Sequence, residues 1–294
     1  MISKFNTKKS TKQESSALIE GWSDPNRFNP FGLFILLRKN VYPILLLVRL
    51  GILGNSMNFF SSLVWTAISP VLLIVPYTLV VHDLLGKGWS GKTIGRGEHG
   101  FILFAGLLVH SFLIDALSRS SSSIIINAGM VRKTSFPRVI LPVSYLGIST
   151  VPFLLNLAVT IIGSLAFNTV RIEALWLVPL AIIMLSFYLI ALSILISSIA
   201  SYFRNIVQIV PFIGAFLLFA GPIFYSLDSV PKPWQYLLLL NPSALPIEML
   251  RAALFGGVVP GMGLIFLYGS AGFIILHIST WCFNKIQEGF SDVL

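Results

Sequence analysis

Residues 86–93 form a glycine-rich stretch that matches the phosphate-binding loop of nucleotide-binding proteins. The stretch reads Gly-Lys-Gly-Trp-Ser-Gly-Lys-Thr, and in such loops backbone amides hold phosphates while the lysine reaches the terminal ones. A working loop of this kind follows a buried strand in an α/β domain, whereas this one follows an apolar stretch. Gly95, Gly97 and Gly100 match a dinucleotide-binding pattern without a surrounding βαβ unit. We therefore expect neither motif to bind a nucleotide.

The remaining reactive side chains form no catalytic or metal-binding pattern. The histidines and the single cysteine are His82, His99, His110, His277 and Cys282. Their spacing suits no zinc site, and one cysteine cannot form an intrachain disulfide. Asp115 and Arg119 are four residues apart, which predicts a pair on one helix face. Because no Ser/His/Asp, Cys/His or paired-carboxylate set appears, we expect a protein that is not an enzyme and binds no cofactor itself.

The composition indicates an integral membrane protein. Of the 294 residues, 55% are hydrophobic and only 11% charged, and the mean hydropathy is +0.87. The apolar residues form long uninterrupted runs, which are typical of membrane spans. The net charge of +9 could indicate a nucleic-acid partner, but the placement of the charges argues against it. Fourteen of the 20 Lys and Arg residues fall on one side of the predicted spans, which predicts that both termini are cytoplasmic.

The runs predict an all-α fold with six transmembrane helices. The spans are residues 61–81, a second that begins at Phe101 and runs into serines 120–123, and residues 139–167, 174–203, 206–227 and 261–283. Each is long enough for a hydrocarbon core of about 30 Å. We expect three segments: a flexible cytoplasmic tail (1–28), an amphipathic interface helix (29–58) and a six-helix transmembrane domain (59–294).

The interface helix is expected to lie on the membrane surface. Arg38, Lys39 and Arg49 interrupt its apolar sequence, and Pro43 should kink it. Arg38 and Arg49 are eleven residues apart, which places them within about 20° on a straight helix. A basic stripe on an apolar helix suits the membrane surface.

The segment between the last two spans, residues 228–260, is too apolar for a solvated loop and too rich in proline for a clean span. It predicts two re-entrant half-helices forming an outer gate, or alternatively an interfacial loop that lies flat. The residues assigned to this gate region are Tyr225, Asp228, Trp234, Asn241, Pro242, Glu248 and Arg251.

Three stretches resemble the permease subunits of polysaccharide-exporting ABC transporters. Residues 127–142 read Asn-Ala-Gly-Met-Val-Arg-Lys-Thr-Ser-Phe-Pro-Arg-Val-Ile-Leu-Pro, similar to the family's characteristic stretch between the second and third spans. Residues 63–79 and 219–257 agree with it. The resemblance implies an inner-membrane homodimer that works with two copies of a separate ATPase, which would bind ATP and Mg²⁺.

The resemblance also implies roles for cationic and aromatic residues. Arg132, Lys133, Phe136, Pro137 and Arg138 would form the loop that couples to the ATPase. Arg38, Lys39 and Arg49 would meet the pyrophosphate of a lipid-linked glycan or bulk lipid phosphates. The aromatics that would stack on sugars along a pore, or simply pack, are Phe104, Phe112, Phe212, Phe216 and Phe224.

The function that these features favour is ATP-driven export of a lipid-linked polysaccharide such as O-antigen, capsule or teichoic acid, from the cytoplasm across the inner membrane. Two other classes are considered: a membrane-embedded enzyme acting on lipid-linked sugars, and a channel or secondary transporter that needs no ATPase. Neither alternative predicts the Phe136-Pro137-Arg138 stretch as a docking element.

Overall fold

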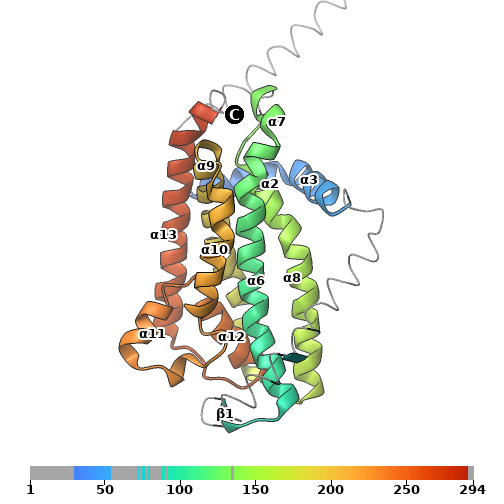
Figure 1. Ribbon diagram of the computed structural model, residues 1–294, viewed down its shortest axis with the longest axis vertical. Coiled ribbons are helices and arrows are strands. Elements are labelled where there is room, and N and C mark those ends of the chain that lie inside the picture. Colours follow the sequence, from blue (N-terminus) through green and yellow to red (C-terminus); the bar gives the residue numbers. More distant parts are fainter. Residues whose placement is uncertain are drawn as a thin grey trace, which may run out of the picture.

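The computed structural model of the chain (Figure 1) describes residues 30–53, 72, 75–76, 79, 88–89, 92–133 and 136–290. Its longer helices are α2 (Pro30–Lys39), α3 (Val41–Leu53), α6 (Arg96–Ile126), α7 (Ala128–Lys133), α8 (Ile140–Ala166), α9 (Leu177–Tyr202), α10 (Ile206–Phe219), α11 (Lys232–Leu238), α12 (Ala244–Leu254) and α13 (Met262–Ile286). The 3-10 turns are η4 (Ile172–Ala174), η5 (Leu227–Ser229) and η6 (Gln287–Gly289). A small antiparallel ribbon pairs β1 (Gly88–Trp89) with β2 (Lys92–Thr93).

This ribbon contains the described part of the glycine-rich stretch. Gly88 pairs with Thr93 and Trp89 with Lys92, while α6 begins only at Arg96. In a phosphate-binding loop the Lys-Thr pair stands at the N-terminus of the following helix, where the helix amides face the phosphate. The geometry here therefore differs from that of a nucleotide site.

Four helical segments are long and apolar enough to cross a membrane. They are α6 with 31 residues, α8 with 27, Ile172–Tyr202 with 31 and Met262–Gly289 with 28. A hydrocarbon core needs about 20 helical residues. These segments correspond to the second, third, fourth and sixth predicted spans, so the chain is a multi-pass membrane protein. The first predicted span, residues 61–81, lies largely outside the described residues.

The predicted fifth span is shorter in the structure. Residues 206–227 are predicted to cross, but α10 contains only 14 residues and ends at Phe219. Gly221 and Pro222 follow and disfavour a further turn, because glycine has low helix propensity and proline lacks the amide hydrogen. The helix interior does accommodate an earlier proline, Pro211. The count of six spans therefore stays a prediction.

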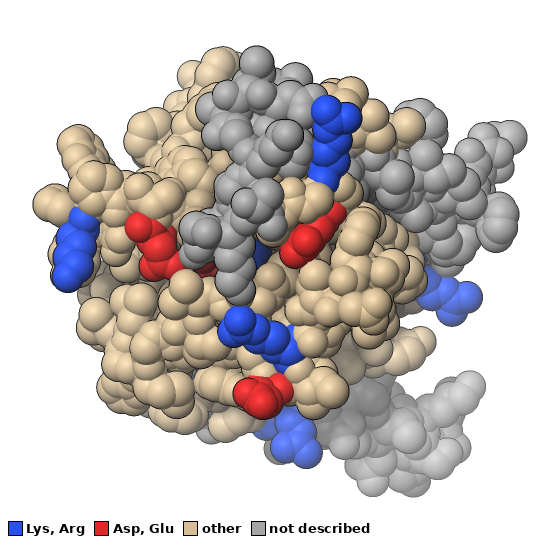
Figure 2. All heavy atoms as spheres, turned by 90° about the horizontal axis from the view of Figure 1, so that it is seen from below, with Lys and Arg blue, Asp and Glu red and all other residues tan. Residues whose placement is uncertain are grey.

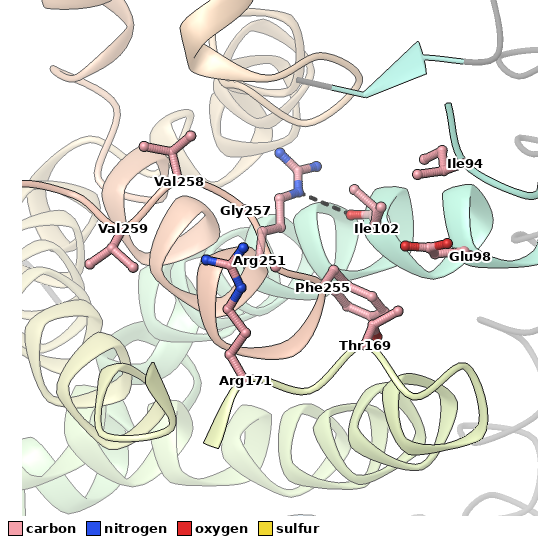
Figure 3. Close-up of a pocket in the computed structure, with 11 residues that line it drawn as sticks. Ile94, Glu98, Ile102, Thr169, Arg171, Arg251, Phe255, Gly257, Val258 and Val259 are labelled. Carbon is pink, nitrogen blue, oxygen red and sulfur yellow. Dashed lines mark hydrogen bonds between the residues drawn. The ribbon is translucent and has the colours of Figure 1, made fainter. Parts of the chain in front are cut away.

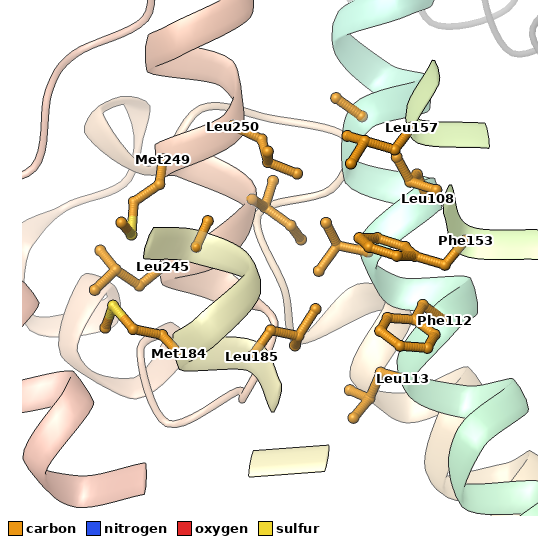
Figure 4. Packing of buried hydrophobic residues seen from close by; sticks show 14 of the residues in the cluster. Leu108, Phe112, Leu113, Phe153, Leu157, Met184, Leu185, Leu245, Met249 and Leu250 are labelled. Atoms are coloured by element: carbon orange, nitrogen blue, oxygen red, sulfur yellow. The ribbon is translucent and has the colours of Figure 1, made fainter. Parts of the chain in front are cut away.

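Helix α6 is the central element of the bundle (Figure 1), with α8, α9, α10 and α12 packed against it. Phe112 of α6 stacks on Phe153 of α8, with ring centroids 4.3 Å apart and planes 18° apart. Leu113, Leu185 of α9 and Leu245 of α12 continue the same buried cluster (Figure 4). Close packing of this kind holds membrane helices together, because lipid supplies no hydrophobic driving force between them.

The predicted interface helix is two helices. α2 and α3 are bent by 70° at a break around Asn40. Pro43 lies in the first turn of α3, and its ring would clash with the carbonyl of Lys39 in a continuous helix. The Asn40 side chain closes the end of α2 by donating to the Leu36 carbonyl at 2.8 Å. Arg38 and Arg49 therefore lie on different helices and do not share one stripe.

Many serine and threonine hydroxyls in the long helices donate to a carbonyl of their own helix. Examples are Ser123 to Ser120 at 2.7 Å, Ser144 to Ile140 at 2.8 Å, Ser198 to Ile194 at 2.8 Å and Thr280 to Leu276 at 2.7 Å. This satisfies the hydroxyl where no water is present. Other hydroxyls donate from one helix to another: Ser120 to Pro142 at 3.2 Å, Tyr188 to Tyr268 at 2.9 Å and Tyr202 to Ile286 at 3.0 Å.

The Asp115–Arg119 pair is formed as predicted. The Arg119 Nε lies 2.8 Å from a carboxylate oxygen of Asp115. Both side chains are largely exposed on α6, so the pair is a local contact on the helix surface.

Candidate functional site

The predicted functional residues gather at the two ends of the bundle. In Figure 1, α2, α3, α7 and the C-terminal end of α13 lie at one end, which we name the α7 end, whereas α11, α12 and β1 lie at the other, the α12 end. Each end is described in turn.

The coupling stretch, residues 127–142, reverses the chain between α6 and α8. Asn127 follows the last turn of α6 and donates from its side chain to the Ser123 carbonyl at 2.7 Å and the Tyr145 hydroxyl at 3.1 Å. The Pro137 carbonyl accepts the Ile140 amide at 3.0 Å, which starts α8. The stretch is thus tied to both long helices that flank it.

The residues of this stretch differ in exposure. Arg132 is exposed on α7, while Phe136, Pro137 and Arg138 are half-buried; Lys133 lies in α7, and its side chain is outside the described residues. Arg138 donates from Nη1 to the Gln287 carbonyl in η6. Arg132 is therefore an exposed cation, whereas Arg138 ties the stretch to the C-terminal end of α13.

The same end of the bundle contains an apolar cluster, which we name the α7-end cluster. Its buried members are Leu33, Ile124, Val131, Val139, Leu141, Ala191, Ile194, Leu276, Phe283 and Phe290, with Phe136 packed against them. Phe290 makes an edge contact with Phe283, with centroids 5.7 Å apart, and lies 5.9 Å from the Tyr202 ring. The Tyr202 hydroxyl donates to the Ile286 carbonyl at 3.0 Å. The cluster joins α2, the coupling stretch, α9 and α13.

The three cations of the N-terminal helices are all exposed. Arg38 and Lys39 end α2, and Arg49 lies on α3. Figure 1 shows α3 crossing the direction of the long helices near the α7 end. Exposed cations in this position suit lipid phosphates at a membrane surface.

At the α12 end, a buried arginine joins three segments. Arg251 is 1% exposed and donates from Nε to Ile102 of α6 at 3.0 Å, as Figure 3 shows. It also donates to the carbonyls of Pro222 and Ile223 and lies 3.2 Å from Glu248. Burial raises the pKa of the Glu248 carboxyl, and the Arg251 charge opposes that shift.

Asn241 holds the same segment from the other side. Its side chain is buried and donates to the carbonyls of Leu217 at 2.9 Å and Ala220 at 3.2 Å. Its Oδ1 accepts the Ser243 amide at 3.0 Å, and its own carbonyl accepts the Tyr268 hydroxyl. Asn241 and Arg251 together fix the end of α10 and the turn that follows it.

The other predicted gate residues lie nearer the surface. Asp228 and Trp234 are exposed, and Tyr225 and Pro242 are half-buried. The predicted half-helices appear as α11, which has no buried residue, and α12, in which all eleven residues are buried. Their insertion into a membrane remains a prediction.

The close approach of α6 to Arg251 depends on Gly106. A Cβ at this position would lie 2.6 Å from Nη2 of Arg251 and 3.2 Å from the Ile223 backbone. We expect Gly106→Ala to lower the free energy of unfolding by about 1–3 kcal/mol, the usual cost of overpacking. Gly263→Ala is the matched control, because nothing lies within 4 Å of its added Cβ. Denaturation in detergent measures both; equal stabilities would contradict the packing of α6 described here.

The predicted pore aromatics fall into two groups. Phe104 and Phe112 are 3% and 7% exposed and pack inside the chain. Phe212 and Phe216 are 76% and 71% exposed on α10, and Phe224 is half-buried beyond its end. A single chain therefore offers the α10 rings to a lumen, a second copy or lipid.

Comparison with known proteins identifies the family. The model of the ABC-2 type transporter family matches residues 44–255, more than half of the chain. The O-antigen export system permease RfbA of Klebsiella pneumoniae is 27% identical over 233 residues, which cover 78% of this chain and 86% of that protein. The inner membrane transport permease YadH of Escherichia coli K12 is 26% identical over 239 residues, covering 79% and 91%. The chain belongs to the ABC-2 type transporter family.

Proposed function

We propose that the chain is the permease subunit of an ATP-driven exporter that moves lipid-linked polysaccharide, with O-antigen as the leading substrate, across the bacterial inner membrane. Two copies of the chain would form the pore, and two copies of a separate ATPase would bind ATP and Mg²⁺. The relatives named as O-antigen export permeases support the substrate class.

The observation that carries this proposal is the coupling stretch. It follows α6, the central helix of the bundle, and is hydrogen-bonded to α8 and to η6. If the ATPase displaced α7, the displacement would therefore be transmitted directly to the core of the bundle. We place the α7 end and both termini on the cytoplasmic side of the membrane, and the α12 end, as the outer gate, on the opposite side.

The exposed cations and aromatic rings of the chain agree with export from the cytoplasmic side to the outer gate. Arg38, Lys39 and Arg49 would attract the pyrophosphate of the lipid carrier at the cytoplasmic surface. The exposed rings of Phe212 and Phe216 would line the path between two copies and stack on sugar faces. The buried hydrogen bonds of Arg251 would keep the outer gate closed until the ATPases act.

The proposal is tested by copurification with a co-expressed ABC ATPase from the same organism. We expect a stable complex in which the permease changes the rate of ATP hydrolysis, and export of glycan only when both proteins are present. Glycan export that continues without the ATPase would refute the proposal and favour a channel or secondary transporter.

Reversing the exposed charge on α7 should weaken docking. We expect Arg132→Glu to lower the affinity for the ATPase about tenfold or more, because it places an anion against an acidic partner surface. Titrating immobilised permease with the ATPase measures this. Arg204→Glu is the control, since Arg204 is exposed in the turn between α9 and α10; equal losses in both variants would mean that α7 has no special role.

A further inference from the structure

A cavity of about 640 Å³ lies at the α12 end. Figure 3 shows its walls: Glu98 and Ile102 from the start of α6, Thr169 and Arg171 from the connection between α8 and α9, and Phe255 with the residues after α12. Its size is typical of small-ligand sites. The residues assigned above to coupling or gating, apart from Arg251, do not line it.

Hydrogen bonds between its walls keep the cavity formed. The Arg171 amide donates to the Ala253 carbonyl at 2.9 Å, and the Thr169 hydroxyl donates to the Leu254 carbonyl at 2.7 Å. Arg251 connects the same region to Ile102. A ligand would therefore enter a site whose three walls are already in place, which lowers the entropic cost of binding.

Two opposite charges in the cavity have no protein partner in the described part of the chain. The Glu98 carboxylate is half-buried and the Arg171 guanidinium exposed, and neither side chain forms an ion pair or hydrogen bond there. Arg171 lies against Gly256, where φ is +67° and a Cβ would stand 3.3 Å from its Nε. The glycine thus permits both the turn and the position of the guanidinium.

This combination suits a neutral polyhydroxyl ligand. The carboxylate accepts hydrogen bonds from hydroxyl groups, and the guanidinium donates to hydroxyl or ring oxygens. Val258 and Val259, which also line the cavity and are exposed, offer apolar surface to the C–H face of a sugar ring. Because the lining carries both signs of charge, it favours a ligand that offers donors and acceptors together over a simple ion. Figure 2, which views this end of the molecule, shows only scattered charged side chains on a mainly uncharged surface.

We propose that the cavity binds a short saccharide stretch of the exported glycan at the outer end of its path. This rests on the proposed function and adds a site to it. Glu98 and Arg171 orient the sugar through its hydroxyls, while Val258 and Val259 contact its ring face. Bound there, the glycan would be held back from slipping inward between ATPase cycles.

Binding is measured with the complex of permease and ATPase in phosphatidylglycerol nanodiscs. The probe is the mixture of oligosaccharides released by mild acid from the host's own lipid-linked glycan, followed by saturation-transfer NMR and titration calorimetry. We expect Glu98→Gln and Arg171→Ala each to weaken binding about tenfold or more, because each removes charge-assisted hydrogen bonds. Glu173→Gln and Lys232→Ala, at exposed positions outside the cavity, should leave it unchanged.

The possible outcomes distinguish failure of the saccharide site from failure of the proposed export function. If the wild-type complex exports glycan but the cavity variants bind oligosaccharide like wild type, or wild type binds none, the saccharide site is refuted and the exporter stands. If phosphatidylethanolamine added to the nanodiscs displaces the sugar and its own binding falls in both variants, the cavity is a zwitterionic lipid site and the proposal is wrong. A complex that exports no glycan refutes the proposed function itself. Gel filtration of every variant confirms folding.

Discussion

Arg251→Met is expected to lower the free energy of unfolding by about 3–5 kcal/mol, the cost of removing one partner from a buried ion pair. The change leaves the Glu248 carboxylate buried without its cation and frees the carbonyls of Ile102, Pro222 and Ile223. The midpoint of SDS-induced unfolding measures the loss. Lys232→Met, at an exposed cation of the same end, should have little effect.

A second change at Glu248 distinguishes the cost of the unpaired carboxylate from the cost of the hydrogen bonds that Arg251 loses. Glu248→Gln added to Arg251→Met removes the unpaired carboxylate and should recover part of the lost stability, whereas the lost bonds to three carbonyls are not recovered. An Arg251→Met protein as stable as wild type would show that the guanidinium does not anchor α12.

Phe290→Ala, in the α7-end cluster, is expected to lower the free energy of unfolding by about 3–5 kcal/mol, the usual cost of deleting a buried phenylalanine ring. Phe290 is fully buried against Phe283 and Tyr202. Because the cluster holds the coupling stretch, the variant should also lose stimulation of the ATPase while it still binds that partner through Arg132. Paired hydrolysis and binding assays measure this.

Phe203→Ala controls for the loss of a ring, because Phe203 lies near the same end but is 68% exposed. Combining Phe290→Ala with Arg138→Ala should cost less than the sum of the two, since both release the same segment from the coupling stretch. Full additivity would show that the Arg138–Gln287 bond and the Phe290 contacts act separately.

The sequence was sufficient to predict the long helices because their signal is local. The predicted stretches 139–167, 174–203 and 261–283 match α8, α9 and α13 closely, since uncharged runs of this length have one stable form in lipid. The break near Pro43 and the two short helices before α13 follow from proline chemistry in the same way. The first span and the flexible tail are untested, because they lie largely or wholly outside the described residues.

The contacts of the candidate sites depend on distant partners and could not be predicted. Arg251 was assigned to a gate because residues 228–260 are apolar and rich in proline, but its acceptors on Ile102 and Pro222 are 149 and 29 residues away. Arg138 was assigned to the coupling loop by resemblance, and its hydrogen bond to the Gln287 carbonyl, 149 residues away, has no local signal in the sequence. Pairs of this kind are set by how the helices assemble.

The hydroxyls that bond to their own helices have a mechanical consequence. Ser123, Ser144, Ser198 and Thr280 need nothing from the adjacent helix, so neighbouring helices can slide by part of a turn without leaving these four donors unpaired in lipid, which would cost several kcal/mol. Such a shift would break the hydrogen bonds that do cross between helices, which include those from Ser120 to Pro142, from Tyr188 to Tyr268 and from Tyr202 to Ile286. Besides these bonds, the hydrogen bonds of Arg138 at one end of the bundle and of Arg251 at the other are polar contacts that oppose helix movement.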